Sequence, residues 1–180
     1  MNNVIEATPL RIKKPAIPAV EENKLRTDIR NYILFFIFAL VISGVTAFPI
    51  ETELAFIHNH ISSFPLFLQE WINKVYIAVK TTNEHYPFLS YGTDWLAFAH
   101  LVIATAFLGP LLDPVKNIWV IQWGMIACIG IFPLAFIAGS IRGIPFFHQL
   151  IDCSFGVFGF ILLFICCKKI VMLEKIEQAK

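Results

Sequence analysis

Five ionisable residues fall inside or at the edges of long apolar segments of this sequence: Asp94, His100, Arg142, His148 and Asp152. An ionisable side chain at the centre of a bilayer costs about 2.5–3.5 kcal/mol on insertion scales, so such residues mark candidate functional sites. A histidine beside a carboxylate can act as an acid–base pair, because the carboxylate fixes the tautomer of the imidazole. The same residue types also join helices by hydrogen bonds, and this structural interpretation stays open beside the chemical one.

Helical counting places these residues in two layers. The two apolar segments that carry them run inward from the same face of the membrane, so equal residue counts give equal depths. Asp94 then lies level with His148 or Arg142. His100 lies level with Asp152, about 12–14 Å below that face. Because His148 and Asp152 are four residues apart, they share one helix face. We therefore expect a polar cleft between the two segments that opens toward this face.

The remaining histidines offer weaker candidates for a metal or a cofactor. His58 and His60 form an H-x-H pair that could supply two metal ligands. No third ligand follows at a recognisable spacing, so the pattern favours ordinary surface histidines over a metal site. A haem held by His100 and His148 is chemically allowed, but their depths differ by about 7–8 Å. The sequence therefore assigns no cofactor, and no metal site beyond this weak pair.

The composition indicates a membrane protein. Of the 180 residues, 57% are hydrophobic and 15% are charged, and the mean hydropathy is +0.70. A soluble domain has about 25% charged residues, so this chain has too few polar groups to cover a surface that faces water. The balance of 14 basic and 13 acidic residues gives no reason to expect a nucleic-acid partner.

Four apolar segments are long enough to cross a bilayer, which needs about 20 such residues. Thr93 is expected to cap the second span, and Pro133 predicts a kink in the third. The predicted fold is an all-α, polytopic membrane protein with a four-helix transmembrane bundle. We expect its spans at about 31–49, 91–112, 118–138 and 144–167.

Small residues predict where the spans approach each other closely. Gly124 and Cys128 lie one turn apart in the third span, and Gly156 and Gly159 mark the fourth. Ala97, Ala104 and Thr105 have the same role in the second. Cysteines in or beside apolar segments are expected to be free packing residues: Cys128, Cys153, Cys166 and Cys167.

The long connection between the first two spans predicts an amphipathic helix. Ser63 and Pro65 form a plausible helix start, a side-chain cap followed by proline in the first turn. Apolar and aromatic residues then recur at helical spacing, with charged residues between them. This pattern is typical of a helix that lies at the membrane surface. The recurring residues are Phe67, Trp71, Val75 and Val79.

Basic residues predict the orientation. Residues 1–30 are expected to form a flexible basic tail, with room for a short helix at 20–30, and residues 170–180 a polar helix. The two tails and the 113–117 turn hold eleven Lys or Arg, against three in the opposite connections. The positive-inside rule therefore places both termini in the cytoplasm and the long connection on the outer side.

Two stretches carry a recognisable pattern. The first is Tyr91-Gly92-Thr93-Asp94-Trp95-Leu96-Ala97-Phe98-Ala99-His100, and the second is Arg142-Gly143-Ile144-Pro145-Phe146-Phe147-His148, which continues as Ile151-Asp152-Cys153-Ser154-Phe155-Gly156. They resemble a group of small four-span membrane proteins from bacteria of the Bacteroidota type. The resemblance implies a bacterial inner membrane and transfers no activity. A looser likeness to the four-span sterol-isomerase and sigma-2-receptor fold transfers no residue roles.

Two functions from different classes fit these observations. The first is a non-enzymatic accessory or scaffold protein, which agrees with the amphipathic connection and with the lack of a complete catalytic motif. The second is a small binding protein or enzyme for a lipid or quinone-like substrate, with His100 and Asp152 as the acid–base pair. Transport is less favoured, because no inverted repeat relates the two halves. The expected partners are the bilayer and either a second copy or another membrane protein.

Overall fold

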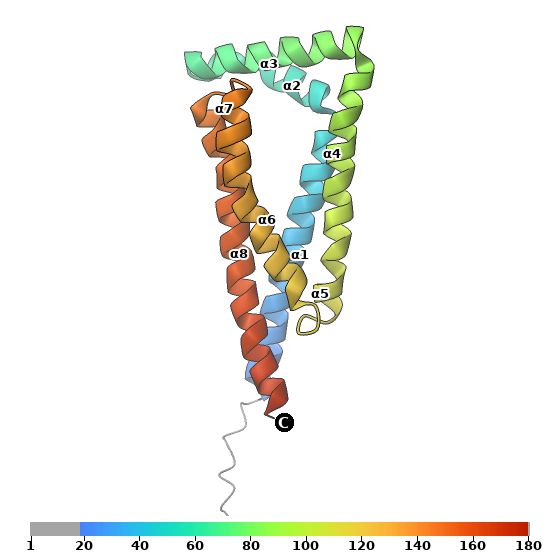
Figure 1. Cartoon of the computed structure of the whole chain (residues 1–180), viewed down its shortest axis with the longest axis vertical. Helices are drawn as coiled ribbons and strands as arrows, with labels where there is room; N and C mark the ends of the chain where they lie inside the picture. The colour runs from blue at the N-terminus through green and yellow to red at the C-terminus, as the bar shows by residue number, and fades with distance from the viewer. Residues whose placement is uncertain (1–18, 180) are drawn as a thin grey trace, which may run out of the picture.

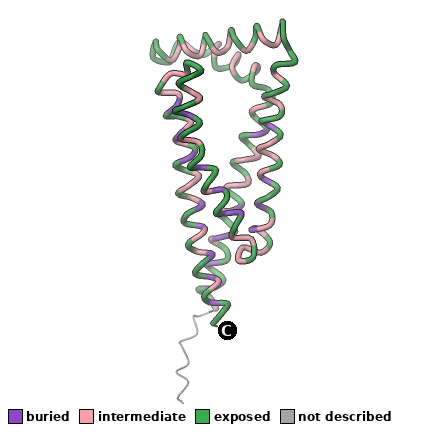
Figure 2. Tube along the Cα trace, viewed as in Figure 1, coloured by how far each residue is buried: buried purple, intermediate pink, exposed green. Residues whose placement is uncertain are grey.

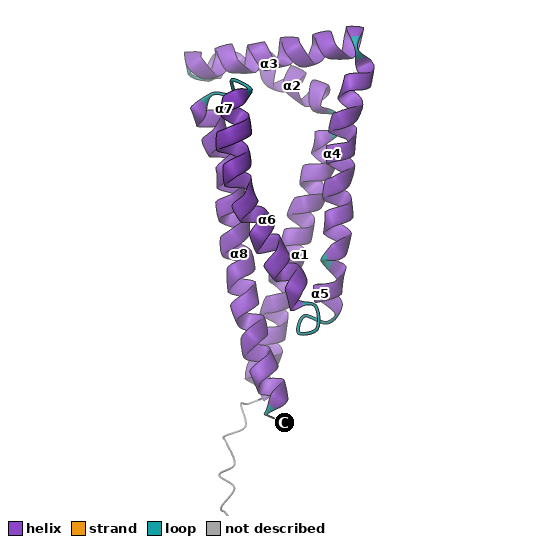
Figure 3. Ribbon diagram, in the orientation of Figure 1, coloured by secondary structure: helices purple, strands orange, loops and turns teal. Residues whose placement is uncertain are grey.

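The computed structural model describes residues 19–179, which form helices joined by short turns (Figure 3). In this part of the chain, four helical segments are long and apolar enough to cross a membrane. The predicted all-α, four-span membrane fold is therefore confirmed. The spanning segments are α1 (Ala19–Ala47), α4 (Pro87–Ala106) with α5 (Leu108–Leu112), α6 (Ile118–Pro133) with its extension, and α8 (Phe146–Gln178).

The long connection forms a cap of helices over one end of the bundle (Figure 1). We use the name helical cap for α2 (Ile50–Asn59), the short 3₁₀ helix η1 (Ile61–Ser63) and α3 (Leu66–His85). The predicted amphipathic helix is α3, which lies across the ends of the spans. It begins after Pro65 and has no side-chain cap, so the capping role expected of Ser63 is not seen.

Three helix boundaries differ from those expected. Helix α1 begins at Ala19, so residues 19–30 continue the first span, and the rest of the predicted tail lies outside the described residues. Helix α4 begins at Pro87, which suits the first turn because proline needs no hydrogen-bond partner there. Thr93 is therefore inside the helix and does not cap it. Helix α8 runs unbroken to Gln178.

The third span is disturbed where Pro133 predicts a kink. Proline lacks a backbone N–H and its ring clashes with the carbonyl one turn earlier. The structure has a π-helical turn, η2 (Leu134–Ala138), directly after Pro133, and then the short helix α7 (Gly139–Ile141). A π turn of this kind accommodates an irregular hydrogen-bond pattern within a helix.

A buried glutamine holds the turn between α7 and α8. Gln149 is 4% exposed, and its Nε2 donates to the backbone oxygen of Ile144 at 2.8 Å. The same nitrogen lies 3.5 Å from Ser140 Oγ. Gly143 has a φ of 69°, a backbone conformation that favours glycine, and it allows the chain to reverse. These contacts fix the start of the fourth span.

The spans form two pairs, and α1 joins them because it also packs on α8. Helix α6 packs on α8, and α4 packs on α1. The two pairs meet at the end where the described chain begins and ends, and they diverge toward α3 (Figure 1). Buried residues run along α8 and the first half of α1, whereas α2 and α3 have none (Figure 2). The core that joins the pairs includes Ile29, Ile33, Phe107, Ile121, Leu163 and Ile170.

Small residues allow the closest helix contacts, as the sequence predicts. A Cβ on Gly156 would lie 2.8 Å from the backbone oxygen of Cys128, and one on Gly159 would lie 2.9 Å from Cys128 Sγ. Between α1 and α4, a Cβ on Gly44 would lie 2.9 Å from the backbone oxygen of Ala97. Thr105 is exposed, so the packing role expected of it is wrong.

The turn between the second and third spans is held by polar contacts. The Lys116 ammonium donates to Asp113 Oδ2 at 2.9 Å, and this hydrogen bond lowers the pKa of the Asp113 carboxyl below its ordinary value. Asn117 Nδ2 donates to the backbone oxygen of Asp113 at 2.9 Å. Because the pKa is lowered, the carboxylate stabilises the turn at neutral pH and loses this effect only as the pH falls through the lowered value.

Helices α1 and α8 extend together beyond that turn as an antiparallel pair (Figure 1). We call residues 20–30 and 168–178 the terminal stalk. Two ion pairs cross it: Lys169 Nζ lies 2.7 Å from Asp28 Oδ2, and Arg26 Nη2 lies 2.6 Å from Glu177 Oε1. Between the helices, the stalk buries Leu25, Ile29, Ile170, Leu173 and Ile176.

Candidate functional site

The structure does not bring His100 and Asp152 together. Helix α4 packs on α1, whereas α8 packs on α6 and α1. His100 Nδ1 is hydrogen-bonded to the backbone oxygen of Leu96 at 2.8 Å, within its own helix. Asp152 Oδ1 lies 4.0 Å from His148 Nε2, one turn earlier in the same helix. Among residues 19–179, no hydrogen bond or ion pair joins the predicted acid to the predicted base.

The predicted outer layer, Asp94 with His148 or Arg142, is also not assembled. Asp94 lines a recess at the end of α4 that meets α2. His148 faces α3, with its ring centroid 5.8 Å from that of Trp71 in an edge-on contact. Arg142 is exposed in the turn that follows α7. These polar residues are therefore distributed around the helical cap and do not form one cleft.

Aromatic contacts attach the first part of α3 to the start of α8. The Phe67 and Phe147 rings meet edge-on with centroids 5.2 Å apart, beside the contact between Trp71 and His148. Lys74 Nζ lies 5.9 Å from the Trp71 ring centroid, within the range of a cation–π interaction. Pairs of aromatic rings contribute about 0.5–1.5 kcal/mol beyond the area that they bury. This cluster fixes one end of the cap to the α6–α8 pair.

A chain of hydrogen bonds attaches the other end of α3. Ser90 Oγ on α4 donates to Asn83 Oδ1 on α3, and Asn83 Nδ2 donates to Glu51 Oε2 on α2. The three side chains thus connect three helices. They line a recess of about 250 Å³ together with Asp94 and Thr93. The recess is polar and part-buried, and its hydrogen bonds hold the cap to the α1–α4 pair.

The two histidines of the H-x-H pair, His58 and His60, have separate partners. His58 Nε2 lies 3.1 Å from Asn73 Oδ1, and the His58 ring stacks on Tyr76 with centroids 4.6 Å apart. His58 therefore joins α2 to α3. His60 Nδ1 is hydrogen-bonded to the backbone oxygen of Phe56 at 2.9 Å. Within the described part of the chain, no group of three or more His, Cys, Asp or Glu side chains could hold a metal ion.

Sequence reasoning missed the residues that make the cap a single unit. Glu51, Asn83 and Ser90 are ordinary polar residues of a connecting segment, and nothing in their spacing indicates that they meet. The buried Gln149 was missed because an uncharged amide near a span end is unremarkable by composition. The position of Trp71 on the predicted amphipathic helix could have indicated the attachment of that helix, since a surface helix needs an anchor on the spans.

Replacing Asn83 with leucine is expected to loosen the cap. The substitution removes both hydrogen bonds of the chain and leaves part-buried polar groups on Ser90 and Glu51 without that partner. The expected destabilisation of the cap is about 1–3 kcal/mol. Hydrogen exchange of α2 and α3, followed by mass spectrometry in detergent micelles, should become faster. Asn59→Leu, the same change at an exposed position, is the control, and equal exchange in both variants would contradict the prediction.

Comparisons with protein-family models, curated proteins and solved structures found no match for this chain.

Proposed function

We propose that this protein is a membrane accessory protein that holds a protein partner on its helical cap. The observation that supports this function is the two-ended attachment of α3. Aromatic contacts with Phe147 and His148 hold its first half, and the hydrogen bonds of Asn83 hold its second half. A surface helix attached at both ends loses little conformational entropy on binding, which favours a binding role.

The free face of α3 has the composition of a small interface. Ile77 is 54% exposed near the middle of the helix, and exposed polar and charged residues surround it. An apolar centre with a polar rim is typical of surfaces that bind proteins reversibly. Both signs of charge occur on this face, so the partner surface should carry both signs as well. The rim residues include Glu70, Asn73, Lys74, Lys80 and Glu84.

The location of this surface follows from the distribution of basic residues. The terminal stalk and the 113–117 turn lie at the end of the bundle opposite the cap, and that end carries most of the Lys and Arg within residues 19–179. The positive-inside rule then places the stalk in the cytoplasm and the cap on the outer side. In a bacterial inner membrane the cap faces the periplasm, so the partner is a periplasmic protein or the outer face of a membrane protein.

The alternative function, a lipid or quinone enzyme with an acid–base pair, depends on His100 and Asp152 sharing a cleft. These residues lie on α4 and α8, which both pack on α1 and make no extensive contact with each other. The nearest polar partner of each belongs to its own helix, the Leu96 carbonyl for His100 and His148 for Asp152. Near the cap, His148, Asn83 and Glu51 are engaged in attaching α2 and α3. The observed side-chain contacts build the cap and do not assemble an acid–base site, so they favour the accessory function.

Site-specific photo-crosslinking in native membranes tests this function. A photoreactive amino acid at position 77 should give one protein adduct, with another membrane protein, a periplasmic protein or a second copy of the chain. The control position is Phe158, which is 72% exposed on α8 and lies in a spanning segment. Lys80→Glu should weaken the adduct at position 77 by reversing a rim charge. Lipid adducts alone at position 77 would overturn the proposal.

A further inference from the structure

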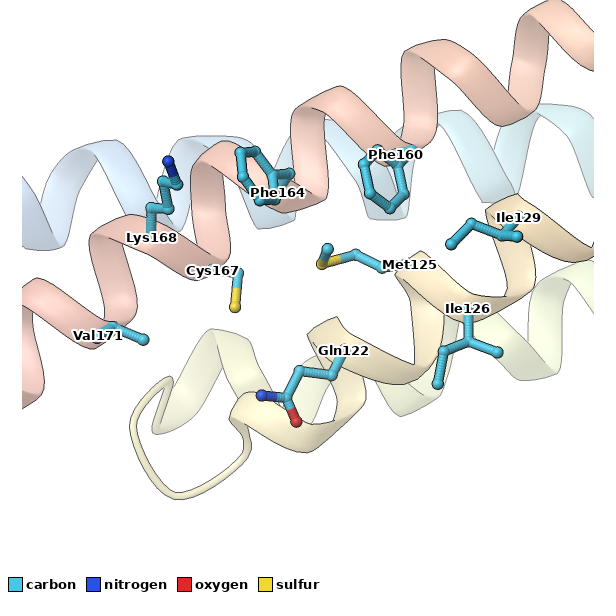
Figure 4. A pocket seen from close by; sticks show the side chains of 9 residues that line it. All are labelled: Gln122, Met125, Ile126, Ile129, Phe160, Phe164, Cys167, Lys168 and Val171. Carbon is cyan, nitrogen blue, oxygen red and sulfur yellow. The ribbon is translucent and has the colours of Figure 1, made fainter.

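A groove of about 630 Å³ runs along the surface between α6 and α8 (Figure 4). Residues at helical spacing form each wall, so the groove faces outward from the bundle and away from the buried contact between the two helices. Within a membrane such a surface faces lipid. The apolar walls include Met125, Ile126 and Ile129 of α6 and Phe160 and Phe164 of α8.

One end of the groove adjoins a close contact between the two helices. Gly156 and Gly159 bring α8 against Cys128 of α6, at distances that leave no room for a Cβ. Ile129 and Phe160, which directly follow two of these residues, form the adjoining end of the groove. From there the groove runs toward the terminal stalk, between the first turns of α6 and the later turns of α8.

The lining gains polar residues along that direction. Ile129 lies at one end, and Lys168 and Val171 of α8 lie toward the other (Figure 4). Gln122, in the second turn of α6, is the other polar residue among those that line the groove. Because α8 becomes strongly charged after Cys167, Lys168 marks the level at which the apolar span ends. The groove is therefore apolar at membrane depth and cationic at the level of the headgroups.

Lys168 has a different environment from its neighbour. Lys169 Nζ is paired with Asp28 Oδ2 at 2.7 Å, whereas Lys168 Nζ lies 4.6 Å from the centroid of the Phe164 ring. Within residues 19–179, Lys168 forms no ion pair. A lysine at the edge of a span directs its ammonium toward the headgroup layer, where an anionic lipid supplies the opposite charge.

We propose that this groove binds an anionic phospholipid from the leaflet on the side of the terminal stalk. One acyl chain lies between α6 and α8 against Ile126 and Phe160, and the phosphate is bound by Lys168. The lining is suited to an acyl chain and not to a second helix, because close helix packing in membranes requires small residues. The small residues of this helix pair, Gly124, Gly156 and Gly159, are already used against the bundle's own side chains and backbone.

Native mass spectrometry of the purified full chain, titrated with dioleoyl-phosphatidylglycerol or dioleoyl-phosphatidylcholine, tests the site. We expect one phosphatidylglycerol per chain, bound more tightly than phosphatidylcholine with the same acyl chains. Lys168→Gln should weaken the binding of phosphatidylglycerol about fivefold, to the affinity of phosphatidylcholine. One lysine charge near an anionic surface has about that effect. Ile126→Trp fills the groove from an exposed position and should weaken both lipids.

Lys175→Gln is the matched control, because it makes the same charge change on the same helix outside the groove. It should leave the affinity for both lipids unchanged. Equal weakening by Lys168→Gln and Lys175→Gln would mean general attraction to charge and would overturn the site. Unchanged lipid binding in Ile126→Trp would also overturn the site. So would a dimer of the unsubstituted protein that Ile126→Trp abolishes, because a second copy would then occupy the groove.

Discussion

Replacing Gly156 with leucine is expected to force α6 and α8 apart and to destabilise the bundle by about 3 kcal/mol. A Cβ at this position would lie 2.8 Å from the backbone oxygen of Cys128, and backbone atoms cannot rotate away as a flexible side chain can. The midpoint of unfolding in detergent micelles measures the loss. Gly130→Leu is the matched control on α6, since a Cβ there meets nothing within 4 Å. Similar midpoints for the two variants would contradict the prediction.

The same contact predicts a difference between two neighbouring glycines. At Gly159 the obstructing atom is the Cys128 sulfur, 2.9 Å from the position of a Cβ, and at Gly156 it is the Cys128 backbone. Cys128→Ala should therefore restore much of the stability lost in Gly159→Ala and little of that lost in Gly156→Ala. A double-mutant cycle measures this coupling. Equal rescue of both glycine variants would show that the helices do not meet in this geometry.

The spans and their closest contacts could be predicted because membranes restrict the sequence strongly. A spanning helix must be apolar over its length, so its position is visible in composition alone. Close contact between spans requires small residues, so Gly156, Gly159 and Cys128 indicate surfaces of close approach, although not which spans meet there. The amphipathic helix was visible for a related reason, since Phe67 and Trp71 recur at helical spacing.

The predicted cleft shows what helical counting leaves out. The rise per residue gives the depth of His100 and Asp152, but it does not say which neighbour each helix has. In a four-span bundle each helix can pack on any of three others, and here α4 and α8 both pack on α1 and not extensively on each other. An isolated histidine in a span can also satisfy a ring nitrogen locally, as His100 does with Leu96. Depth was therefore insufficient to predict a pair.

The cap and the stalk were underestimated because each depends on segments far apart in the chain. Asn83 meets Glu51 across a separation of 32 residues, and no local pattern predicts that hydrogen bond. The stalk had a local signal that was passed over. Leu25, Ile29 and Ile33 recur at helical spacing inside a charged segment, as do Ile170 and Leu173. Charge suggested a flexible tail, whereas the apolar spacing is that of a helix with a buried face.

Replacing Leu173 with alanine is expected to open the terminal stalk. Leu173 is fully buried between α1 and α8, and truncating a buried leucine costs about 2–5 kcal/mol. The ion pair between Arg26 and Glu177 crosses the same pair of helices but is about 40% exposed, with side-chain values of 44% and 38%. An exposed pair of this kind contributes about 0–1 kcal/mol. The apolar residues should therefore dominate the stability of the stalk.

Hydrogen exchange can separate these two contributions. In Leu173→Ala, amides of residues 20–30 should exchange about 30-fold faster or more, the factor that corresponds to the lower limit of that energy. Glu177→Gln should change the exchange rate of the same amides by less than about fivefold. Met172→Ala, at the exposed position next to Leu173, should change it by less still. Since Gly156 lies far along α8 from Leu173, exchange around Gly156 should stay slow in all three variants. A larger effect for Glu177→Gln than for Leu173→Ala would mean that charge holds α1 to α8, and that residues 20–30 are attached to the membrane domain by their ion pairs.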